Sequence, residues 1–333
     1  TATITLSDTA IKAGDSATVT ITFTEAVTNF SNADVILTNA NGALGTLASA
    51  DGGITWTGTY TPTANVEDTS NVITIGTVYN DIAGNTGTAA TSANYTVDTL
   101  APNAPTAVTL TPTGGTVVAN TLNATNTSLV GQATITAGQA TGGKAELYIG
   151  STLVATDSTI ASTDTTVSFT TSDGTPTSAE LQALISAGGV ASVKLYDAAG
   201  NVISSSVSNP SLTVDYVTPT VAITSDKTSF IAGQTATVSF TFSEAPTGFI
   251  AGDITTTGGL LSGLTASADP KVYTALFTPT VNTNSLSGAI QLTGAYTDTA
   301  GNAGATSNTI SISGDTLAPT VTGVSETAAT IKA

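Results

Sequence analysis

Carboxylates are the side chains of this 333-residue sequence whose types and spacing could do chemistry. Three segments with the pattern Asp-x-Ala-Gly-Asn begin at Asp81, Asp197 and Asp298. A second aspartate follows each of them after 17 or 18 residues, shortly before a proline, at Asp98, Asp215 and Asp315. Carboxylates held close together repel one another unless they are protonated or share a cation. Oxygen-only ligand sets suit calcium better than metals that seek nitrogen or sulfur, so the pattern predicts calcium.

The remaining composition excludes most catalytic chemistry. The chain has no cysteine and no histidine, which removes disulfides, thiol nucleophiles, and every Ser-His or Cys-His pair. Its six basic residues are all lysines, and none lies in a Ser-x-x-Lys arrangement. Two carboxylates could hydrolyse a glycosidic bond only in a substrate cleft, for which small modules leave little room. We therefore predict that the chain is not an enzyme.

The charge balance narrows the class of partner. A net charge of −17 repels phosphate backbones and anionic headgroups, so nucleic acid and membrane surfaces are excluded as partners. Only 9% of residues are charged, against about 25% in an ordinary soluble domain, which leaves a surface of Thr, Ser, Asn, Gly and Ala. No apolar run approaches the roughly 18 residues of a membrane span. Methionine is absent even at position 1, so we expect the natural polypeptide to begin upstream.

An internal repeat defines the organisation of the chain. The segment 4–26 recurs as 223–245 at an offset of 219, and the later match of 60–62 with 277–279 has an offset of 217. Two copies of one module thus flank a divergent middle module. We predict boundaries in the Pro-containing linkers near 102 and 219. The expected parts are a first module (1–102), a middle module (103–219), a third module (220–319), and the first strand of a following module (320–333, near Val321 to Val324).

Alternation of apolar and polar residues predicts β structure in every module. The clearest runs are 17–23, 166–170 and 235–242, in which β-branched or aromatic residues alternate with Thr and Ser. Turn residues interrupt such runs at short intervals, and about seven short strands per 100 residues are typical of a two-sheet sandwich. The predicted fold class is therefore all-β, with three tandem immunoglobulin-like β-sandwiches.

The middle module contains one helical signal. Thr177-Ser-Ala-Glu180 has the pattern of a capping box, and Leu184 and Ile185 continue an apolar stripe that begins at Leu181. The pair Gly188-Gly189 is a typical stop signal. The sequence predicts a short helix over 178–187 that crosses from one sheet to the other.

Three motifs together resemble a known family. They are Phe-Thr/Ser-Glu-Ala, which contains Glu25 and Glu244, the Asp-x-Ala-Gly-Asn segments, and the linker Asp-Thr-x-Ala-Pro. In these motifs the chain resembles the bacterial Ig-like repeats of giant cell-surface and biofilm-associated adhesins. The resemblance covers nearly the whole chain, and the outer modules are the most similar. It implies an immunoglobulin-like sandwich exported from a bacterium to its surface, with calcium commonly bound near domain junctions.

This topology predicts which carboxylates should meet. The loops after the second strand and before the last strand lie at the end facing the preceding domain, while the last strand carries its final aspartate to the opposite end. One junction should combine Asp215 with Glu244, Asp253 and Asp298. A second should combine Asp98 with Asp197, weakened by the uncharged loop 137–143. Three further residues, Glu25, Asp34 and Asp81, are expected to form such a group with an aspartate upstream of this sequence. Asp315 is expected to do so with residues of a downstream module.

Each of these residues also has a purely structural interpretation. Asp-x-Ala-Gly-Asn is a good turn, because Asp caps nearby amides, Gly adopts a positive φ and Asn tolerates it. Under this interpretation Glu25 and Glu244 are solvated loop residues, Asp34 and Asp253 cap loops, and the asparagines of the motif are structural.

We predict an architectural function for the chain. It is expected to be an extracellular stalk of a bacterial surface adhesin, in which calcium locks neighbouring Ig-like modules together. Its expected partners are the neighbouring Ig-like modules of the same chain. Other copies of the chain, or a host or biofilm surface, are further expected partners, reached through domains outside this sequence. The main alternative is a self-assembling subunit of a surface layer, sheath or filament, joined by strand addition. Glycan recognition is a third hypothesis, which an aromatic content of 5% does not favour.

Overall fold

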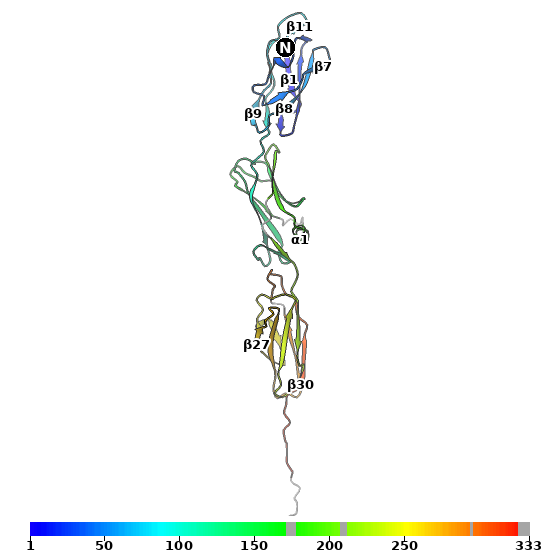
Figure 1. Cartoon of the computed structure of the whole chain (residues 1–333), viewed down its shortest axis with the longest axis vertical. Coiled ribbons are helices and arrows are strands. Elements are labelled where there is room, and N and C mark those ends of the chain that lie inside the picture. Colours follow the sequence, from blue (N-terminus) through cyan, green and yellow to red (C-terminus); the bar gives the residue numbers. More distant parts are fainter. Residues whose placement is uncertain (171–177, 207–211, 294–295, 326–333) are drawn as a thin grey trace, which may run out of the picture. The chain divides into compact units, whose positions relative to one another are not determined.

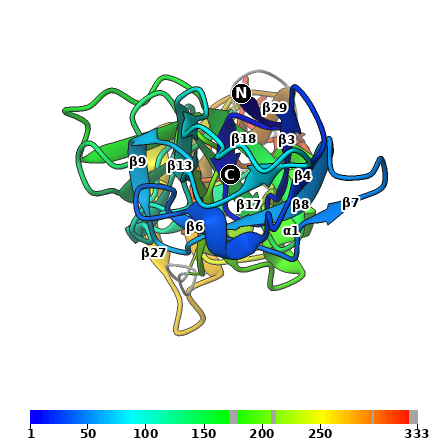
Figure 2. The ribbon, with the colours of Figure 1, turned by 90° about the horizontal axis from the view of Figure 1, so that it is seen from above.

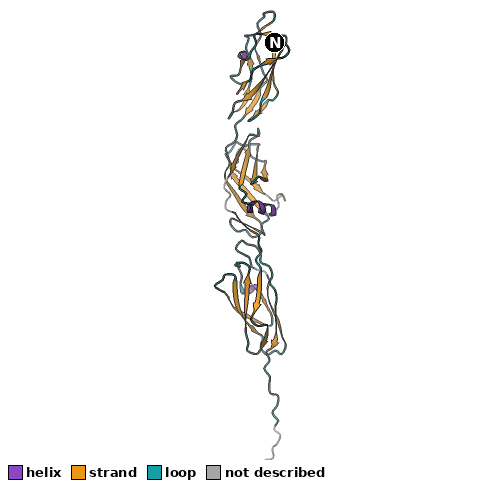
Figure 3. Cartoon of the chain, turned by 45° about the vertical axis from the view of Figure 1, so that its right-hand side comes forward, coloured by secondary structure: helices purple, strands orange, loops and turns teal. Residues whose placement is uncertain are grey.

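The computed structural model describes residues 1–170, 178–206, 212–293 and 296–325, and nearly all of its regular structure is β (Figure 1, Figure 3). This confirms the predicted fold class of immunoglobulin-like β-sandwiches with one short helix. The chain divides into two compact units, Thr1–Thr111 with Leu129–Pro210, and Pro112–Ser128 with Ser211–Ala333. We describe each unit by itself. The boundaries near 102 and 219 stay predictions, and we keep the module names that they define.

The first sheet of unit 1 follows from the alternation in the first module. In the central strand Val19, Ile21 and Phe23 are buried, whereas Thr18 and Thr22 are exposed. Strands pair in the order β1-β3-β8-β6, with β7 also paired to β8. Figure 2 shows β7 beside β8 at the edge of this module. The bounds are β1 Ala2–Leu6, β3 Ala17–Phe23, β8 Thr55–Pro62, β6 Gly42–Leu44 and β7 Ala48–Ser49. The strand predicted over 17–23 is confirmed with the same bounds.

The opposing layer of the first module is divided into short pieces. Its sheets have the orders β2-β13-β9, β12-β10-β5 and β11-β4. The bounds are β2 Ala10–Lys12, β13 Tyr95–Asp98, β9 Glu67–Asn71, β12 Ala90–Thr91, β10 Thr74–Ile75, β5 Val35–Ile36, β11 Asn80–Asp81 and β4 Val27–Thr28. The last strand, β13, pairs in parallel with β2, and this register sets Asp98 opposite Lys12.

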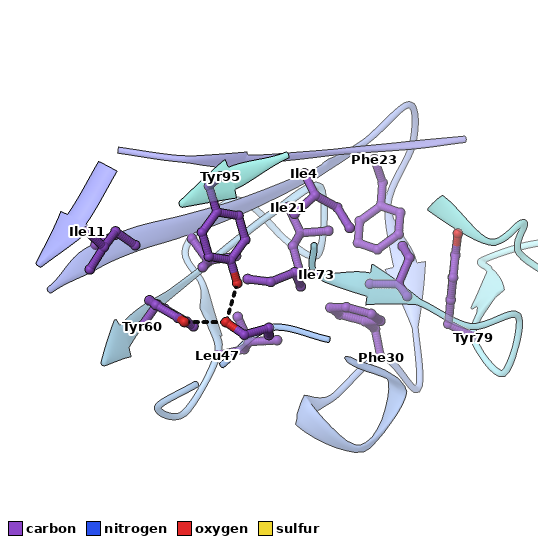
Figure 4. Close-up of a cluster of buried hydrophobic side chains, with 14 of the residues drawn as sticks. Ile4, Ile11, Ile21, Phe23, Phe30, Leu47, Tyr60, Ile73, Tyr79 and Tyr95 are labelled. Atoms are coloured by element: carbon purple, nitrogen blue, oxygen red, sulfur yellow. Dashed lines mark hydrogen bonds between the residues drawn. The ribbon is translucent and has the colours of Figure 1, made fainter. Parts of the chain in front are cut away.

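The core of the first module lies between these two layers (Figure 4). Phe23 and Phe30 meet edge to face at 5.0 Å between ring centroids, beside buried aliphatic side chains. Tyr60 and Tyr95 both donate their hydroxyl hydrogens to the backbone carbonyl of Ala40, which satisfies two polar groups deep in the core. This arrangement fixes the final strand against the opposite sheet and therefore fixes where Asp98 emerges.

Unit 1 also contains two sheets of the middle module, apart from Pro112, Thr113 and Ser128, which belong to unit 2. Their orders are β14-β16-β19 and β18-β17-β20-β21. The bounds are β14 Thr106–Thr113, β16 Ser128–Thr134, β19 Thr166–Thr170, β18 Thr152–Asp157, β17 Lys144–Ile149, β20 Ala191–Tyr196 and β21 Val202–Ser206. The predicted helix is present as α1 (Ser178–Ser186), and Gly188, two residues after its end, has a positive φ of +76° that stops it. Thr177, the expected cap, lies outside the described residues.

Unit 2 repeats the architecture of the first module. Its sheets have the orders β23-β25-β28-β27 and β24-β30-β29-β26, and a separate pair joins β15 to β22. The bounds are β23 Val221–Ser225, β25 Ala236–Phe242, β28 Val272–Pro279, β27 Gly259–Ala266, β24 Ser229–Ile231, β30 Ile310–Asp315, β29 Leu286–Leu292, β26 Ile254–Thr256, β15 Thr121–Asn123 and β22 Thr213–Asp215. A cluster that includes Phe240, Phe277 and Ile290 forms its core.

The segment after the third module has no strand in its described part. Residues 320–325 pair with no other strand, and the side chains of Val321 and Val324 are exposed. A first strand acquires its ladder only when the rest of its sandwich is present. The assignment of 320–333 to a following module therefore stays a prediction, and 326–333 lie outside the described residues.

Candidate metal centre

Three of the predicted carboxylates meet in unit 2. Asp215, Glu244 and Asp298 each offer a carboxylate oxygen, and these oxygens lie within 4.8 Å of one another. Asp215 ends β22, Glu244 follows β25, and Asp298 begins the turn after β29. Asp298 is 1% exposed, and the other two are half-buried. The predicted fourth member, Asp253, is not part of this group, which we call the acidic triad.

The turn 298–302 holds Asp298 in place. Its two carboxylate oxygens accept hydrogen bonds from the backbone N–H and the side-chain Nδ2 of Asn302, both at 2.8 Å. Gly301 supplies the positive φ of +91° that this turn requires. An ionised carboxylate has about four lone-pair sites, so two hydrogen bonds leave it able to bind a cation. The turn-making and metal-binding interpretations of the motif are therefore compatible.

The linker aspartates share one local conformation. Asp215 Oδ1 accepts the N–H of Val217 at 3.0 Å, and Asp315 Oδ1 accepts that of Leu317 at 2.9 Å. Asp98 makes the equivalent, longer bond at 3.3 Å. Each of these bonds leaves the second carboxylate oxygen free of the turn. A side chain held in this way is oriented before any ion binds.

Asn302 does more than close its turn. Its Nδ2 donates to the backbone carbonyl of Asp215 at 3.0 Å, and its Oδ1 accepts the backbone N–H of Ala124 at 2.7 Å. Asn302 is fully buried. The sequence interpretation treated the asparagines of the motif as structural and did not identify this contact. The available signal was the recurrence of asparagine at the fifth position of all three motifs.

Repulsion and burial act together on Glu244. Burial raises the pKa of its carboxyl group, and the nearby charges of Asp298 and Asp215 raise it further. Lys271 opposes this effect, and its Nζ donates to the carbonyl of Ser243 at 3.0 Å. The triad thus disfavours a third negative charge unless a cation compensates it.

The raised pKa of Glu244 predicts a specific pH dependence in the presence of a chelator. Folding favours the protonated form of Glu244, because the pKa is higher in the folded than in the unfolded chain. The stabilisation from this proton is complete below the ordinary pKa near 4.5 and is lost as the pH rises through the raised pKa. We expect Glu244→Gln to stabilise the third module relative to wild type at pH 7 and to have little effect at pH 4. Urea unfolding at both pH values measures this difference, and an equal difference at both would contradict the assignment.

A second acidic group lies in unit 1. Asp98 and Asp197 line one pocket together with Glu67 and Gln139. Burial raises the pKa of Asp98, and the charges of Asp197 and Glu67 add to this rise. Glu67 was not predicted, because it lies in a different strand from every motif residue. Asp98 and Asp197 thus meet as expected, but their ligand set differs from the acidic triad.

The uncharged loop 137–143 reaches this second group through an amide. Gln139 Oε1 accepts the N–H of Asn103 at 2.7 Å. Asn201 repeats the behaviour of Asn302, because its Nδ2 donates to the Asp98 carbonyl at 3.0 Å and its Oδ1 accepts the Ala13 N–H at 2.9 Å. An amide in the place of a third loop carboxylate lowers the negative charge and is expected to weaken cation binding.

The remaining predicted ligands lie apart from these two groups. Asp34 and Asp253 each cap a short 3-10 helix, accepting the N–H of Ser31 at 2.9 Å and of Ile250 at 2.8 Å. Glu25 and Asp81 line one pocket at the end of the first module. Hydrogen bonds from Asn85 lower the pKa of Asp81. Asp315 is exposed at the end of β30.

Comparison with known proteins identifies the family. The model of the bacterial Ig-like domain matches residues 1–97 and 215–313, which is more than half of the chain. The chain belongs to this family. Bacterial Ig-like domains are typically extracellular or surface-associated and are typically non-catalytic. The whole acidic triad falls within the second bacterial Ig-like match.

The other comparisons of this bacterial Ig-like chain found only distant similarity to solved structures. No curated protein matches the sequence. Among solved structures, the I9–I11 tandem of titin has 8% identity and a TM-score of 0.24, covering 95% of this chain and 99% of its own. Murine CEACAM1b has 10% identity and a TM-score of 0.25, covering 62% and 100%. A marsupial T cell receptor has 11% identity and a TM-score of 0.20, covering 94% and 98%. Within the described residues, no helix has the length and apolarity needed to cross a bilayer.

Proposed function

We propose that this bacterial Ig-like repeat protein is an extracellular stalk of a surface adhesin, in which calcium at the acidic triad fastens the linker aspartate to the sandwich that follows it. The observation that carries the proposal is the position of Asp215. This residue ends β22, yet its carboxylate lies within 4.8 Å of oxygens from Glu244 and Asp298. A cation there would join residues from three separate places in the sequence.

The donor set fits calcium. All three side chains offer oxygen, and calcium takes 6–8 oxygen ligands from carboxylates, backbone carbonyls and water. The raised pKa of Glu244 reflects negative charge that a bound cation would neutralise. Extracellular modules typically bind calcium at about 10⁻⁴ to 10⁻³ M, and a half-buried triad of this size agrees with that range.

Residues around the triad would position the ligands. Asn302 orients the Asp298 carboxylate and holds the Asp215 backbone, both through hydrogen bonds that need no metal. Lys271 places an ammonium group beside Glu244, where it partly balances the charge when calcium is absent. The proposed role of calcium is electrostatic, because it would supply the charge that lets three carboxylates stay ionised together.

Calcium binding can be tested with a matched pair of variants. Isothermal titration of the full chain with calcium should give a site near 10⁻⁴ to 10⁻³ M. Glu244→Gln should weaken that site by about tenfold or more, because affinity depends on ligand charge. Glu25→Gln is the control, since Glu25 is the counterpart of Glu244 but has no linker aspartate in this chain. Equal affinities for wild type and Glu244→Gln would exclude the triad as the calcium site.

Scattering and microscopy test the architectural role separately. If calcium fastens the linker, small-angle scattering should show that a chelator changes the overall length and stiffness of the wild-type chain. An unchanged scattering profile would mean that calcium does not hold neighbouring modules in a fixed arrangement, even if it binds. Sheets or fibres of purified protein in electron micrographs would favour the alternative function as a surface layer, sheath or filament subunit.

A further inference from the structure

The two outer modules differ at one sheet edge. One sheet of each module ends at this edge, with β6 beside β8 in the first module and β27 beside β28 in the third (Figure 1). Gly42 pairs with Pro62 and Gly259 pairs with Pro279, so the two edges correspond at the repeat offset of 217. An edge strand has a row of backbone N–H and C=O groups that no neighbouring strand binds. The two modules treat this row of groups differently.

An asparagine side chain covers this edge in the first module. Asn32 Nδ2 donates to the backbone carbonyl of Gly45 at 2.8 Å and, over a longer distance of 3.4 Å, to that of Leu44. Its Oδ1 accepts the backbone N–H of Leu47 at 2.9 Å. The amide therefore binds edge groups as a neighbouring strand would, and Leu47 is buried in the core. We call Asn32 with these three hydrogen bonds the edge cap.

The third module has no edge cap. The short 3-10 helices before these edges correspond at the offset of 219, so Ala251 stands where the first module has Asn32. A methyl group can neither donate nor accept a hydrogen bond. In the part of the chain that the structure describes, no side chain bonds the backbone of Leu261, Ser262 or Leu264, which are the counterparts of the capped residues. The edge of β27 is therefore open where that of β6 is closed.

A pocket lies at the open edge. Its volume is about 250 Å³, and its walls include Ala251, Ile254, Leu261 and Leu264. Leu261 and Leu264 pack against the core of the third module but are only half-buried. Leu47, the counterpart of Leu264 beside the edge cap, is 7% exposed. Apolar side chains of the third module thus reach the surface next to unpaired backbone groups.

The charge pattern of this edge suits a second copy of the chain. Copies carry a net charge of −17 each, so they repel one another unless they meet at an uncharged surface. The stretch 254–268 contains no charged residue, and it also lacks the lysine and proline that commonly protect edge strands. The pairing of β27 with β28 is regular over 259–262 and shifts after Ser262. A further strand can therefore join this regular segment, and two copies related by a two-fold axis can join it antiparallel.

We propose that the open edge of β27 pairs with the same edge of a second copy of this chain. Two four-stranded sheets would then join edge to edge through backbone hydrogen bonds of the segment 259–262. The half-buried side chains of Leu261 and Leu264 would be covered by the partner. Such a contact would hold copies side by side. It includes no metal, so the proposal does not rest on calcium binding.

Cross-linking with one cysteine per chain detects this pairing, because the wild-type chain contains no cysteine. Leu260→Cys places a thiol on the exposed face of the regular segment of β27. Ala43→Cys is the matched control, since Ala43 is the exposed counterpart of Leu260 in β6, beside the edge cap. In a two-fold antiparallel pair, the same residue of both copies lies near the axis, so one substitution is enough to link them.

The experiment treats each full chain with a short bismaleimide in the presence of a chelator. We expect the Leu260→Cys chain to form covalent dimer about tenfold faster than the Ala43→Cys chain, as a difference of one or two hydrogen bonds implies. Adding Ala251→Asn to the Leu260→Cys chain supplies the amide of the edge cap and should slow the reaction about tenfold. Gly252→Asn is the control for that change, because it adds the same amide at the next residue and should leave the rate unchanged.

The reciprocal change tests the role of the edge cap in the first module. Asn32→Ala opens the edge of β6 and should speed dimer formation by the Ala43→Cys chain. Circular dichroism and thermal unfolding verify that each variant is folded. A Leu260→Cys chain that reacts no faster than the Ala43→Cys chain, or whose rate Ala251→Asn does not lower, would overturn the proposal. Slow self-reaction together with capture of a synthetic peptide of residues 257–268 would assign the edge to a free peptide and would also exclude a second copy.

Discussion

Asn302→Ala is expected to expose the Ala124 N–H to hydrogen exchange and to weaken the contact of the turn 298–302 with β15 and β22 by about 1–3 kcal/mol, the sum of two hydrogen bonds of about 0.5–1.5 kcal/mol each. The truncation leaves two backbone groups without their partner, the N–H of Ala124 and the C=O of Asp215. Asn302 is buried, but Ala124 is exposed and Asp215 is half-buried, so water can reach the two backbone groups that lose their partner. Amide exchange followed by NMR in a chelator measures the effect directly, because the Ala124 resonance reports on the hydrogen bond with no contribution from metal.

Asn85→Ala is the matched control for this prediction. Asn85 occupies the same position of the same motif, but it is exposed. In the described chain, its side chain does not join the backbone groups of a parallel strand pair. Its truncation should leave the Ala124 exchange rate unchanged. Ala232, whose N–H has no asparagine partner among the described residues, is an internal reference for an unbridged amide. If Ala124 exchanges as fast as Ala232 in the wild-type chain, the bridge does not form in solution.

Phe277→Ala should lower the free energy of unfolding of the third module by about 3–5 kcal/mol. The Phe277 side chain is fully buried in β28, and its ring lies 5.4 Å from that of Phe230 between centroids. Removing the ring opens a cavity between the two sheets that the surrounding backbone cannot close. Urea unfolding of the full chain, followed by module-specific NMR signals, measures the loss.

The neighbouring residue supplies the control. Leu276 is 44% exposed on the outer face of the same strand, so Leu276→Ala should change stability by about 0.5 kcal/mol or less. The first module has its own core around Tyr60 and Tyr95, and its unfolding should not shift with Phe277→Ala. If both modules unfolded in a single transition, the stabilities of the two cores would be coupled.

Local patterns in the sequence predicted the local structure well. The run 17–23 forms β3 with the expected bounds, because alternation of Val, Ile and Phe with Thr fits only a strand with one buried face. The run 166–170 forms β19 in the same way. Gly188 ends the helix near its predicted end, since a positive φ there is cheap for glycine alone. These features depend on neighbours within a few residues.

The candidate site was predicted only in part. The loop positions of an Ig-like sandwich, together with the repeated motifs, predicted that Asp215, Glu244 and Asp298 would meet, and one carboxylate oxygen of each lies within 4.8 Å of the others. The roles of Asn302, Glu67 and Gln139 could not be predicted in the same way. Asn302 bonds a backbone group 178 residues away, and backbone N–H and C=O groups leave no trace in residue type. Only the fold specifies such a partner.

The chemical nature of the asparagine bridge has a consequence for durability. Its two hydrogen bonds join the buried Asn302 side chain to neutral backbone groups and include no sulfur, so the bridge offers no thiol to an oxidant. Asn302 is followed by alanine and is held on every polar atom, which restrains the backbone motion that its slow hydrolysis to aspartate would need. A contact of this kind forms without a bound ion and without an oxidised sulfur.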